Sequence, residues 1–420
     1  MSEMHLAERA ALFNRIVLEQ AMDQHGLIRH ALTYPDRRPI TEDMLDAVRR
    51  DKERRQRKGL KWHPLAGTPA YAMYEDANYV GNRYLISQVW RWRATQSPEA
   101  RAAAGKAYAA SMYPYDEGAR LERGYWPKPY GALKGENAVD RNYTETSVDQ
   151  AYSPVIALWR YYQYLADEPA KKRIAEALQA HGHWWINHNY QYDYLGEKWQ
   201  AIGQVLNPSS LKIPIGMHIA YRMTGDTVLR DECHRLVRKG FQDGAIRMHR
   251  GPRGEIKELY HWAEIYDYFM RETELKDATD WERLIRECWR AGQSTIQEDG
   301  LCVRMGTFTE AGLVEKYEPG PIDDVHHGYW KTDARDPGST VMIANLAMLV
   351  QELGYDPNAT AVGSQLLAAV TEERTDGLIY LRPEQMAPEN RENPPSGFFS
   401  TRVVVFWLDA YWRGKLLGVF

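Results

Sequence analysis

The sequence lacks the features that mark several large classes of protein. Its three cysteines, Cys233, Cys288 and Cys302, form no CxxC pair and are odd in number, so they predict no disulfide framework and fit a reducing compartment. The chain contains no phosphate-binding loop, no dinucleotide-binding glycine motif and no nucleophile elbow. The usual sequence signals of nucleotide enzymes and of serine hydrolases are therefore missing.

Long hydrophobic runs and long runs of one charge are missing as well. The most apolar late segment, 403–407, is followed by Asp409 and is far too short to span a membrane. The first residues, MSEMHLAERAALFNRIV, carry charged residues among the apolar ones and do not form a signal peptide. The net charge is −4, and acidic residues interrupt the basic run at 49–58. These features predict a cytoplasmic protein that binds neither a membrane nor a nucleic acid.

The chain also lacks a linker, since no Ser/Gly-rich or low-complexity stretch divides it, and we expect residues 1–420 to form one domain. Phenylalanine is scarce, with 8 residues, whereas there are 14 Trp and 27 Tyr. Trp and Tyr combine an apolar ring with a polar group, which suits helix cores and sugar-binding clefts alike. We assign most of them to the core.

What the sequence does have is an internal repeat. Six times a helical pattern gives way to a turn and a short extended run: DQHGLIRHA (23–31), DEGARLERG (116–124), NYQYDYLG (189–196), DGAIRMHRG (243–251), DGLCVRMG (299–306) and DGLIYLRP (376–383). Two helices precede most of these turns, the first rich in aromatic residues and the second amphipathic. The predicted pairs are 78–95 with 98–112, 147–166 with 168–188, 210–224 with 226–241, 258–271 with 280–297, and 339–353 with 358–372.

The two ends of the chain complete this pattern. The segment 8–23 has the pattern of a second helix without its first, and 398–418 that of a first helix without its second. Pairing them gives six hairpins closed into a ring, an all-α (α/α)6 toroid in which the C-terminal inner helix pairs with the N-terminal outer helix. Aromatic first helices line the inside, and amphipathic second helices cover the outside.

The ring predicts one functional face. Connections from each outer helix to the next inner helix are long: 25–77, 117–146, 190–209, 243–257, 300–338 and 377–397. Long loops in a compact domain are usually functional, and these all lie above the N-termini of the inner helices, where helix dipoles favour an anionic ligand. Asp76 and Asp149 occupy nearly equivalent places at the start of two neighbouring inner helices, so both are predicted to point into the mouth of the ring.

The segment VDQAYSPVIALWRYYQYLADE (148–168) resembles an inner helix of the unsaturated uronyl hydrolases, which opens with Asp-Asp and ends in a Leu-Thr-Gly-Asp turn; TGD recurs at 224–226. The resemblance implies a six-hairpin glycoside hydrolase that acts on short uronate-containing oligosaccharides. Asp149 would protonate an unsaturated uronyl ring and then activate water, and Asp76 would tune it. One departure is that NYQYDYLGEKW stands where the family has His-x-Trp-Asp, leaving only Trp199. An ordinary inverting glycosidase with the same two acids is a close variant.

Polar and aromatic residues of the long connections are the expected substrate contacts. The predicted set is Trp126, Arg141, Tyr143, Trp199, Tyr260, His261, His326, His327, Trp330 and Arg335. The cluster at 323–327 carries two Asp and two His, but neighbouring loop residues do not fix ligand geometry, so no metal and no cofactor is expected.

Three other functions remain open at this point. A polysaccharide lyase on the same toroid would use a Tyr or His base, for which Tyr143, Tyr260, His261 and His326 are available, and would neutralise the uronate with Arg141. A sugar epimerase would need paired inward histidines, such as His218 and His261. A non-catalytic sugar-binding protein is the alternative from another class, and a homo-oligomer is equally open.

Overall fold

The structure is a computed structural model, and it describes a set of segments of the 420-residue chain. They are 3–46, 49, 53, 57, 65, 67–129, 145–194, 197–202, 208–242, 254–303, 305–309, 312–316, 336–372 and 398–420. All structural statements below concern these residues.

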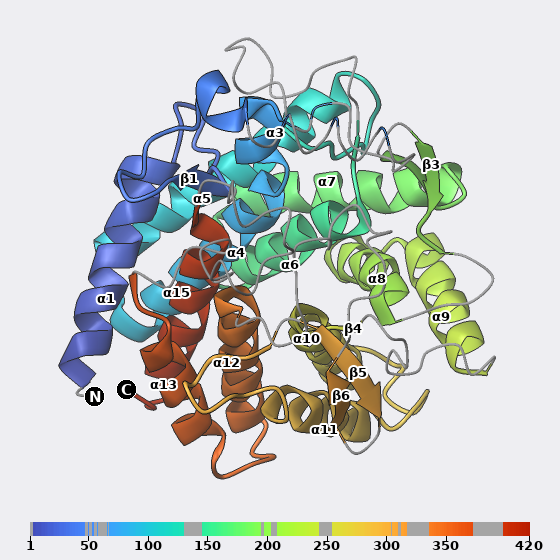
Figure 1. Ribbon diagram of the computed structural model, residues 1–420. Coiled ribbons are helices and arrows are strands. Elements are labelled where there is room, and N and C mark those ends of the chain that lie inside the picture. Colours follow the sequence, from blue (N-terminus) through green and yellow to red (C-terminus); the bar gives the residue numbers. More distant parts are fainter. Residues whose placement is uncertain are drawn as a thin grey trace.

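Helices form two concentric layers around one axis (Figure 1). The inner layer consists of α4 (Ala77–Thr95), α6 (Val148–Tyr164), α8 (Lys212–Thr224), α10 (Ile256–Glu272), α12 (Pro337–Glu352) and α15 (Thr401–Leu416). Each of these helices contacts the next, and α15 contacts α4, so the inner layer is a closed circle. The all-α (α/α)6 toroid predicted from the repeat is confirmed.

The outer layer covers this circle. It consists of α1 (Glu3–Ile16), α5 (Pro98–Ala119), α7 (Glu168–Asn187), α9 (Thr227–Gln242), α11 (Trp281–Gln293) and α13 (Ala359–Ala369). The pattern of apolar residues decides the layer. In α12 every residue from Pro337 to Val350 is buried, whereas α11 buries positions such as 281, 284, 285 and 288 along one face.

Side-chain caps start two of the outer helices, α5 and α7. The Ser97 hydroxyl accepts a hydrogen bond from the backbone of Ala100 at 3.1 Å, and the Asp167 carboxylate accepts one from Ala170 at 2.9 Å. One boundary was predicted wrongly: α5 continues past residue 112 to Ala119 with Pro114 inside the helix. Pro114 is buried, so packing of this last stretch outweighs the missing backbone hydrogen bond.

The ring closes between the two ends of the chain. Phe13 of α1 packs edge-on against Trp407 of α15, with ring centroids 5.2 Å apart. In addition, strand β1 (Ala31–Thr33) pairs antiparallel with β7 (Phe398–Ser400), with Leu32 opposite Phe399. The predicted pairing of the N-terminal and C-terminal helices is therefore confirmed, and a strand pair that the sequence did not predict joins the same ends.

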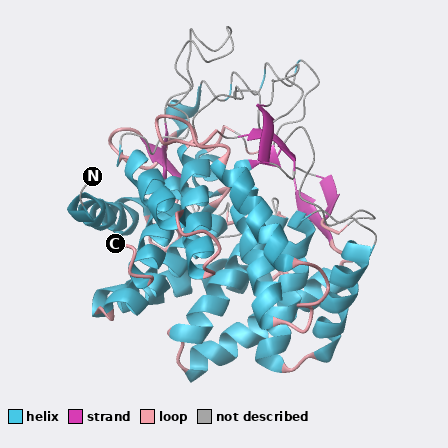
Figure 2. Ribbon diagram, turned by 90° about the horizontal axis from the view of Figure 1, so that it is seen from below, coloured by secondary structure: helices cyan, strands magenta, loops and turns pink. Residues whose placement is uncertain are grey.

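Short elements fill the connections between hairpins. They are the π-helix η1 (Val17–Ala21), the 3-10 helices η2 (Glu42–Leu45) and η4 (Pro208–Leu211), the helix α3 (Pro69–Tyr74), and the strands β2 (Gln191–Tyr194), β3 (Glu197–Gln200), β4 (Gly254–Glu255), β5 (Met305–Thr309) and β6 (Gly312–Lys316). β2 pairs with β3, and β4, β5 and β6 form an antiparallel sheet. Figure 2 shows the strands gathered at one end of the helices. This end, on which the long connections lie, is called the mouth below.

Two of the repeated turns share one geometry. Gly26 and Gly300 both have a left-handed backbone, with φ of 81° and 78°, which a residue with a side chain rarely adopts. Asp23 accepts a hydrogen bond from the backbone N–H of the leucine four residues later, at 2.9 Å, and Asp299 from the leucine two residues later, at 3.2 Å. The aspartate and glycine of the repeat therefore have a structural role at these two turns.

A buried charge network, called the axial network below, joins the four inner helices α4, α6, α10 and α15. Arg83 (α4) donates to Glu264 (α10) at 3.1 Å and to Asp409 (α15) at 3.0 Å. Tyr152 (α6) donates a hydrogen bond to Glu264 at 2.9 Å, and Tyr260 (α10) donates another to Glu264 at 3.2 Å. Burial would raise the pKa of Glu264, but the Arg83 guanidinium outweighs it and holds this pKa at about 2. Glu264 is thus held in a buried ion pair with Arg83.

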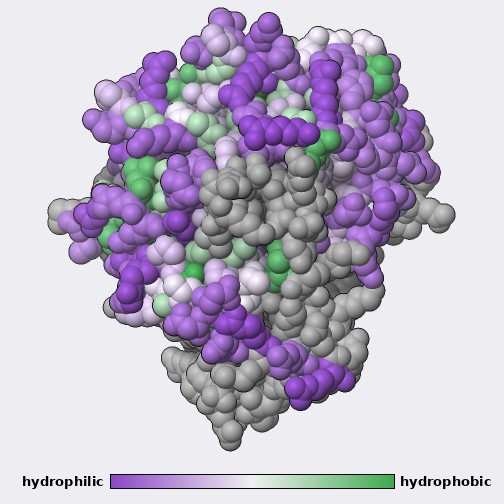
Figure 3. Space-filling model, turned by 90° about the horizontal axis from the view of Figure 1, so that it is seen from above, coloured by the Kyte–Doolittle hydropathy of each residue, from purple (hydrophilic) through white to green (hydrophobic). Residues whose placement is uncertain are grey.

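The outer surface is largely polar. In the side view of Figure 3 the described surface is mainly hydrophilic, with hydrophobic side chains scattered over it. No helix among the described residues is both long enough and apolar enough to cross a membrane.

Candidate active site

Polar side chains gather where the inner helices begin. Asp76 is the residue before α4, Asp149 lies in the first turn of α6, Lys212 starts α8 and Arg402 lies in the first turn of α15. These starts all face the mouth, because each inner helix follows a long connection. The ring therefore brings together residues that are up to 326 positions apart in the sequence.

Asp76 and Asp149 are linked through the residue next to Asp149. Gln150 donates a hydrogen bond from its side-chain amide to Asp76 Oδ1 at 3.1 Å. Asp76 heads α4 without capping it, so its carboxylate is available for this contact. The Asp149 carboxylate acts on groups of two other elements: it adds to the burial that raises the pKa of Tyr79 in α4 and of Tyr192 in β2. Both acids predicted from the sequence thus lie on neighbouring helices at the mouth.

A buried lysine holds Asp149. The Lys212 ammonium lies 2.5 Å from Asp149 Oδ1 and 2.7 Å from Glu258 Oε2. Lys212 is 2 % exposed, whereas the side chain of Asp149 is 41 % exposed. Burial opposes the positive charge of Lys212, but the two carboxylates outweigh it and raise the pKa of this lysine. The Asp149 carboxylate is therefore accessible to solvent, and the buried ammonium of Lys212 fixes its position.

Asp76 has a different environment. Burial and the adjacent Glu75 carboxylate raise its pKa, although Arg402 and Lys128 act in the opposite direction. Glu75 itself forms an ion pair with Lys128, which lowers its pKa in spite of its burial. Arg402 is 3.8 Å from Asp76, beyond hydrogen-bond distance. Of these two neighbouring carboxyls, Glu75 is the ionised one and Asp76 is the one that retains a proton more readily.

A tyrosine and a histidine lie beside these acids. The hydroxyl of Tyr79 (α4) and Nε2 of His261 (α10) are 2.5 Å apart. Burial, with Lys212 and Arg83, holds the pKa of His261 well below its usual range, so the imidazole is neutral. Its Nδ1 is buried and has no hydrogen-bond partner among the described residues. The Arg402 guanidinium lies 5.6 Å from the centre of the Tyr79 ring, which connects this pair to Asp76.

The predicted substrate contacts fall at several places. His261 is at the mouth, whereas Tyr260 belongs to the axial network. Trp126 is fully buried, with its ring 5.0 Å from Tyr115, and Trp199 on β3 is 43 % exposed. Six others lie outside the described residues: Arg141, Tyr143, His326, His327, Trp330 and Arg335. Substrate contact by any of these residues stays a prediction.

Sequence reasoning missed the cations of the site. Lys212 and Arg402 each stand in the first turn of an apolar inner helix, which is the same signal that singled out Asp76 and Asp149. It also missed His30, whose Nδ1 accepts a hydrogen bond from the backbone of Asp76 at 3.2 Å. His218, named for an epimerase, lies in the middle of α8 and contacts Tyr268, so it does not pair with His261.

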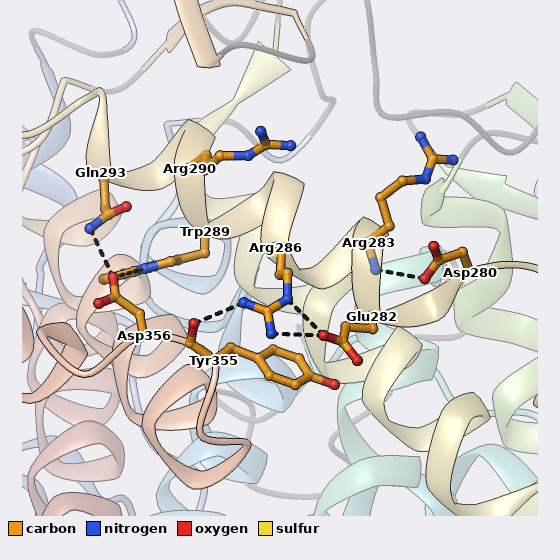
Figure 4. A pocket seen from close by; sticks show the side chains of 9 residues that line it. All are labelled: Asp280, Glu282, Arg283, Arg286, Trp289, Arg290, Gln293, Tyr355 and Asp356. Atoms are coloured by element: carbon orange, nitrogen blue, oxygen red, sulfur yellow. Dashed lines mark hydrogen bonds and ion pairs between the residues drawn. The ribbon is translucent and has the colours of Figure 1, made fainter.

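A separate pocket of about 570 Å³ lies on the outer wall, between α11 and the turn that joins α12 to α13 (Figure 4). Several of its polar groups bond one another. Arg286 donates to the carbonyl of Tyr355 at 2.8 Å, and the indole of Trp289 donates to Asp356 at 2.7 Å. The convergent carboxylates of the mouth, and not this pocket, form the candidate active site.

No protein-family model and no curated protein matches this chain. Solved structures do match it over its whole length. An unsaturated glucuronyl hydrolase specific for heparin aligns with 99% of this chain and 99% of its own length, with a TM-score of 0.52 and 10% identity. A D-mannose isomerase aligns with 100% of this chain and 98% of its own, with a TM-score of 0.51 and 10% identity. The chain thus shares the six-hairpin toroid fold of these two proteins.

Proposed function

We propose that this protein is a carbohydrate-active enzyme, and specifically a glycoside hydrolase that acts on short uronate-containing oligosaccharides at the mouth of the ring. One observation carries the proposal: Asp76 and Asp149 are two linked carboxyls whose environments differ. Burial and Glu75 favour the protonated form of Asp76, while the Lys212 ammonium lies against Asp149. Acid and base roles in one site are assigned by such opposed environments.

The environments of the two acids favour a distribution of roles that differs in one respect from the one that the family resemblance implies, in which Asp149 both donates the proton and activates water. Asp76 holds the proton and acts as the general acid, and the Asp149 carboxylate orients and activates the water. The half-exposed Asp149 carboxylate remains accessible from the mouth, as a water-activating base must be. Arg402 and the N-termini of the inner helices supply positive potential for the carboxylate of a uronate.

The test of the reaction is the ultraviolet absorbance of an unsaturated uronyl end. A hydrolase of this kind consumes the absorbance without added metal. A lyase instead creates it from saturated substrate, so a rising signal would overturn the proposal in favour of elimination. An unchanged signal over a broad panel of unsaturated uronides excludes activity on unsaturated ends, and release of reducing ends from saturated uronides then decides whether the enzyme is an ordinary glycosidase.

The pH dependence of kcat/KM tests the two roles. The general base sets the acidic limb of the profile and the general acid sets the alkaline limb. If Asp76 is the acid, Asp76→Asn removes the alkaline limb and leaves a slow, base-limited rate. Asp149→Asn would remove the acidic limb. Loss of the alkaline limb in Asp149→Asn, with the limb kept in Asp76→Asn, would instead restore Asp149 as the proton donor, as the family resemblance implies.

A second candidate function rests on the His261–Tyr79 pair. A neutral imidazole with a buried Nδ1 that has no partner among the described residues is suited to removing a proton from a sugar carbon, as in an aldose–ketose isomerase or an epimerase. The D-mannose isomerase shares the fold. Incubation with aldoses in heavy water tests it: deuterium at C2 of the sugar, lost in His261→Gln and kept in Asp149→Asn, would establish this function.

A further inference from the structure

A second cluster of side chains with metal-binding chemistry lies away from the mouth. It consists of His218 in α8, His234 in α9 and Glu274 in the turn that joins α10 to α11. One ligand atom from each residue lies within 4.8 Å of the other two. α10 begins at the mouth and Glu274 follows its last turn, so Glu274 lies toward the opposite face. The cluster is thus separate from the candidate active site.

The distances fit coordination better than hydrogen bonding. Nε2 of His218 is 3.3 Å from Glu274 Oε2, and Nε2 of His234 is 3.4 Å from the same oxygen. Tetrahedral Zn²⁺ with bonds of about 2.0–2.1 Å separates neighbouring ligand atoms by about 3.3–3.4 Å. Good N–H···O hydrogen bonds are shorter, at about 2.9–3.0 Å. Two edges of the cluster therefore have the length of the edges of a tetrahedral site.

The hydrogen bonds of the histidines also fit a metal. His218 is fully buried. Its Nδ1 lies 2.9 Å from the Tyr268 hydroxyl, a contact that leaves Nε2 as an acceptor when Nδ1 carries the proton. Nε2 of His234 is buried and makes no hydrogen bond within the described residues. In the tautomers that place both protons on Nδ1, two nitrogen lone pairs and a carboxylate oxygen face one another, an arrangement that a cation between them stabilises.

The surroundings permit a cation. Arg222, one turn after His218, is a nearby positive charge that would repel a bound cation. Its guanidinium lies 3.2 Å from the carboxylate of Glu272, which offsets this repulsion. The Glu274 side chain is 58 % exposed, which leaves a path from solvent and room for a fourth ligand. Three side chains from two consecutive hairpins would be joined, so binding would fasten α8 and α9 to the turn after α10.

We propose that His218, His234 and Glu274 form a binding site for a divalent first-row metal ion, and that Zn²⁺ suits their two imidazoles and one carboxylate best. Water completes the coordination. The role is structural, because the site lies apart from the mouth and its metal links two hairpins.

The experiment uses the full chain, freed of metal with a chelator and then titrated with Co²⁺ and with Zn²⁺. We expect one equivalent to bind, the visible spectrum of tetrahedral Co²⁺ to appear, and the melting temperature to rise with added Zn²⁺. His234→Ala and Glu274→Gln should each weaken binding by at least about tenfold, and Tyr268→Phe by a smaller factor, because it removes only the group that orients His218.

The matched control is His183→Ala, since His183 is a half-exposed outer-layer histidine that pairs with Asp226 at 2.7 Å. This variant should bind both metals as the unchanged chain does. The proposal is overturned if no tetrahedral Co²⁺ spectrum appears, or if His234→Ala and Glu274→Gln bind as tightly as the control, because the cluster would then be only a hydrogen-bonded network. The uronide assay is independent of this result.

Discussion

The axial network and the mouth contain the same chemical groups in different settings. In the axial network Arg83, Glu264 and Asp409 are 3 %, 8 % and 0 % exposed, so cation and carboxylates are all sealed. At the mouth Lys212 is 2 % exposed, but its partner Asp149 is 41 % exposed. The two regions differ in whether solvent and substrate can reach the carboxylate that pairs with the cation. A buried cation fixes the position of an acid in both places, and only the mouth leaves that acid able to meet a substrate.

The two cations, Arg83 and Lys212, also differ in how completely other groups surround them. The Arg83 guanidinium is held between the rings of Tyr260 and Phe406, 5.1 and 4.8 Å from its central carbon. Two of its hydrogen bonds end on Glu264, which also accepts hydrogen bonds from Tyr152 and Tyr260. The ammonium of Lys212 instead connects two acids at the edge of the ring. Closed networks specify a core, whereas a half-open one provides reactive groups.

We expect the largest effect from a substitution that breaks the axial network. Arg83→Met leaves Glu264 and Asp409 buried without their cation, and we expect a loss of about 3–5 kcal/mol in the free energy of unfolding. Urea denaturation followed by circular dichroism measures it. The control at the mouth is Lys212→Met, which should lose less because Asp149 can remain hydrated. Equal losses for the two variants would contradict the comparison.

The next effect concerns turnover. Asp149→Asn should lower kcat on an uronide substrate by at least about a hundredfold, because it removes an acid–base group, and leave the melting temperature nearly unchanged. Glu264→Gln should do the reverse, with a clear loss of stability that precedes any loss of kcat in the fraction that remains folded. Stability losses of the same size for both variants would remove the distinction between the two regions.

Glu264 of the axial network and Asp76 of the mouth should respond to pH with opposite signs. The pKa of Glu264 is lower in the folded chain than in the unfolded chain, so the stability that Glu264 contributes is present above about pH 4.5 and declines as the pH falls. The penalty of Glu264→Gln should therefore shrink from about pH 5 to about pH 3. The pKa of Asp76 is raised on folding, so ionisation of Asp76 destabilises the folded chain as the pH rises.

Asp76→Asn should accordingly become more stable, relative to the unchanged chain, as the pH rises from the usual aspartate range toward neutrality. Thermal unfolding in a series of buffers measures both slopes. A parallel response of the Asp76 and Glu264 variants would show that Asp76 is another sealed ion pair.

The smallest effect tests the positive charge at the mouth. Arg402→Gln should raise KM for an uronide several-fold and leave KM for a neutral sugar analogue unchanged, because only the uronate carries a carboxylate. Its stability should change by no more than about 0.5 kcal/mol, because its Asp76 contact is long and partly exposed. An equal change in KM for charged and neutral sugars would assign Arg402 a general packing role.

The fold was predictable because its signals are local. Alternation of an aromatic helix with an amphipathic one, caps such as Ser97 and Asp167, and unpaired helices at the two ends were sufficient for the six-hairpin ring. Of the residues that the structure brings to the mouth, the sequence pointed to Asp76, Asp149 and His261. Lys212 and Arg402 stand in apolar helices far apart in sequence, and only closure of the ring brings them to one opening. The His218–His234–Glu274 cluster has no local motif at all.

The β1–β7 strand pair has a consequence for synthesis in the cell. Thr401 donates to the backbone carbonyl of Arg29, 372 positions earlier in the chain, beside this strand pair. At about 5–20 residues per second, a ribosome needs about 20–70 s to make the intervening segment. During this time the apolar surfaces of α1 and α4 that pack against α15 in the folded chain remain uncovered, because α15 has not yet been synthesised. We therefore expect the nascent chain to depend on chaperones until α15 emerges, and to release them in a single late step.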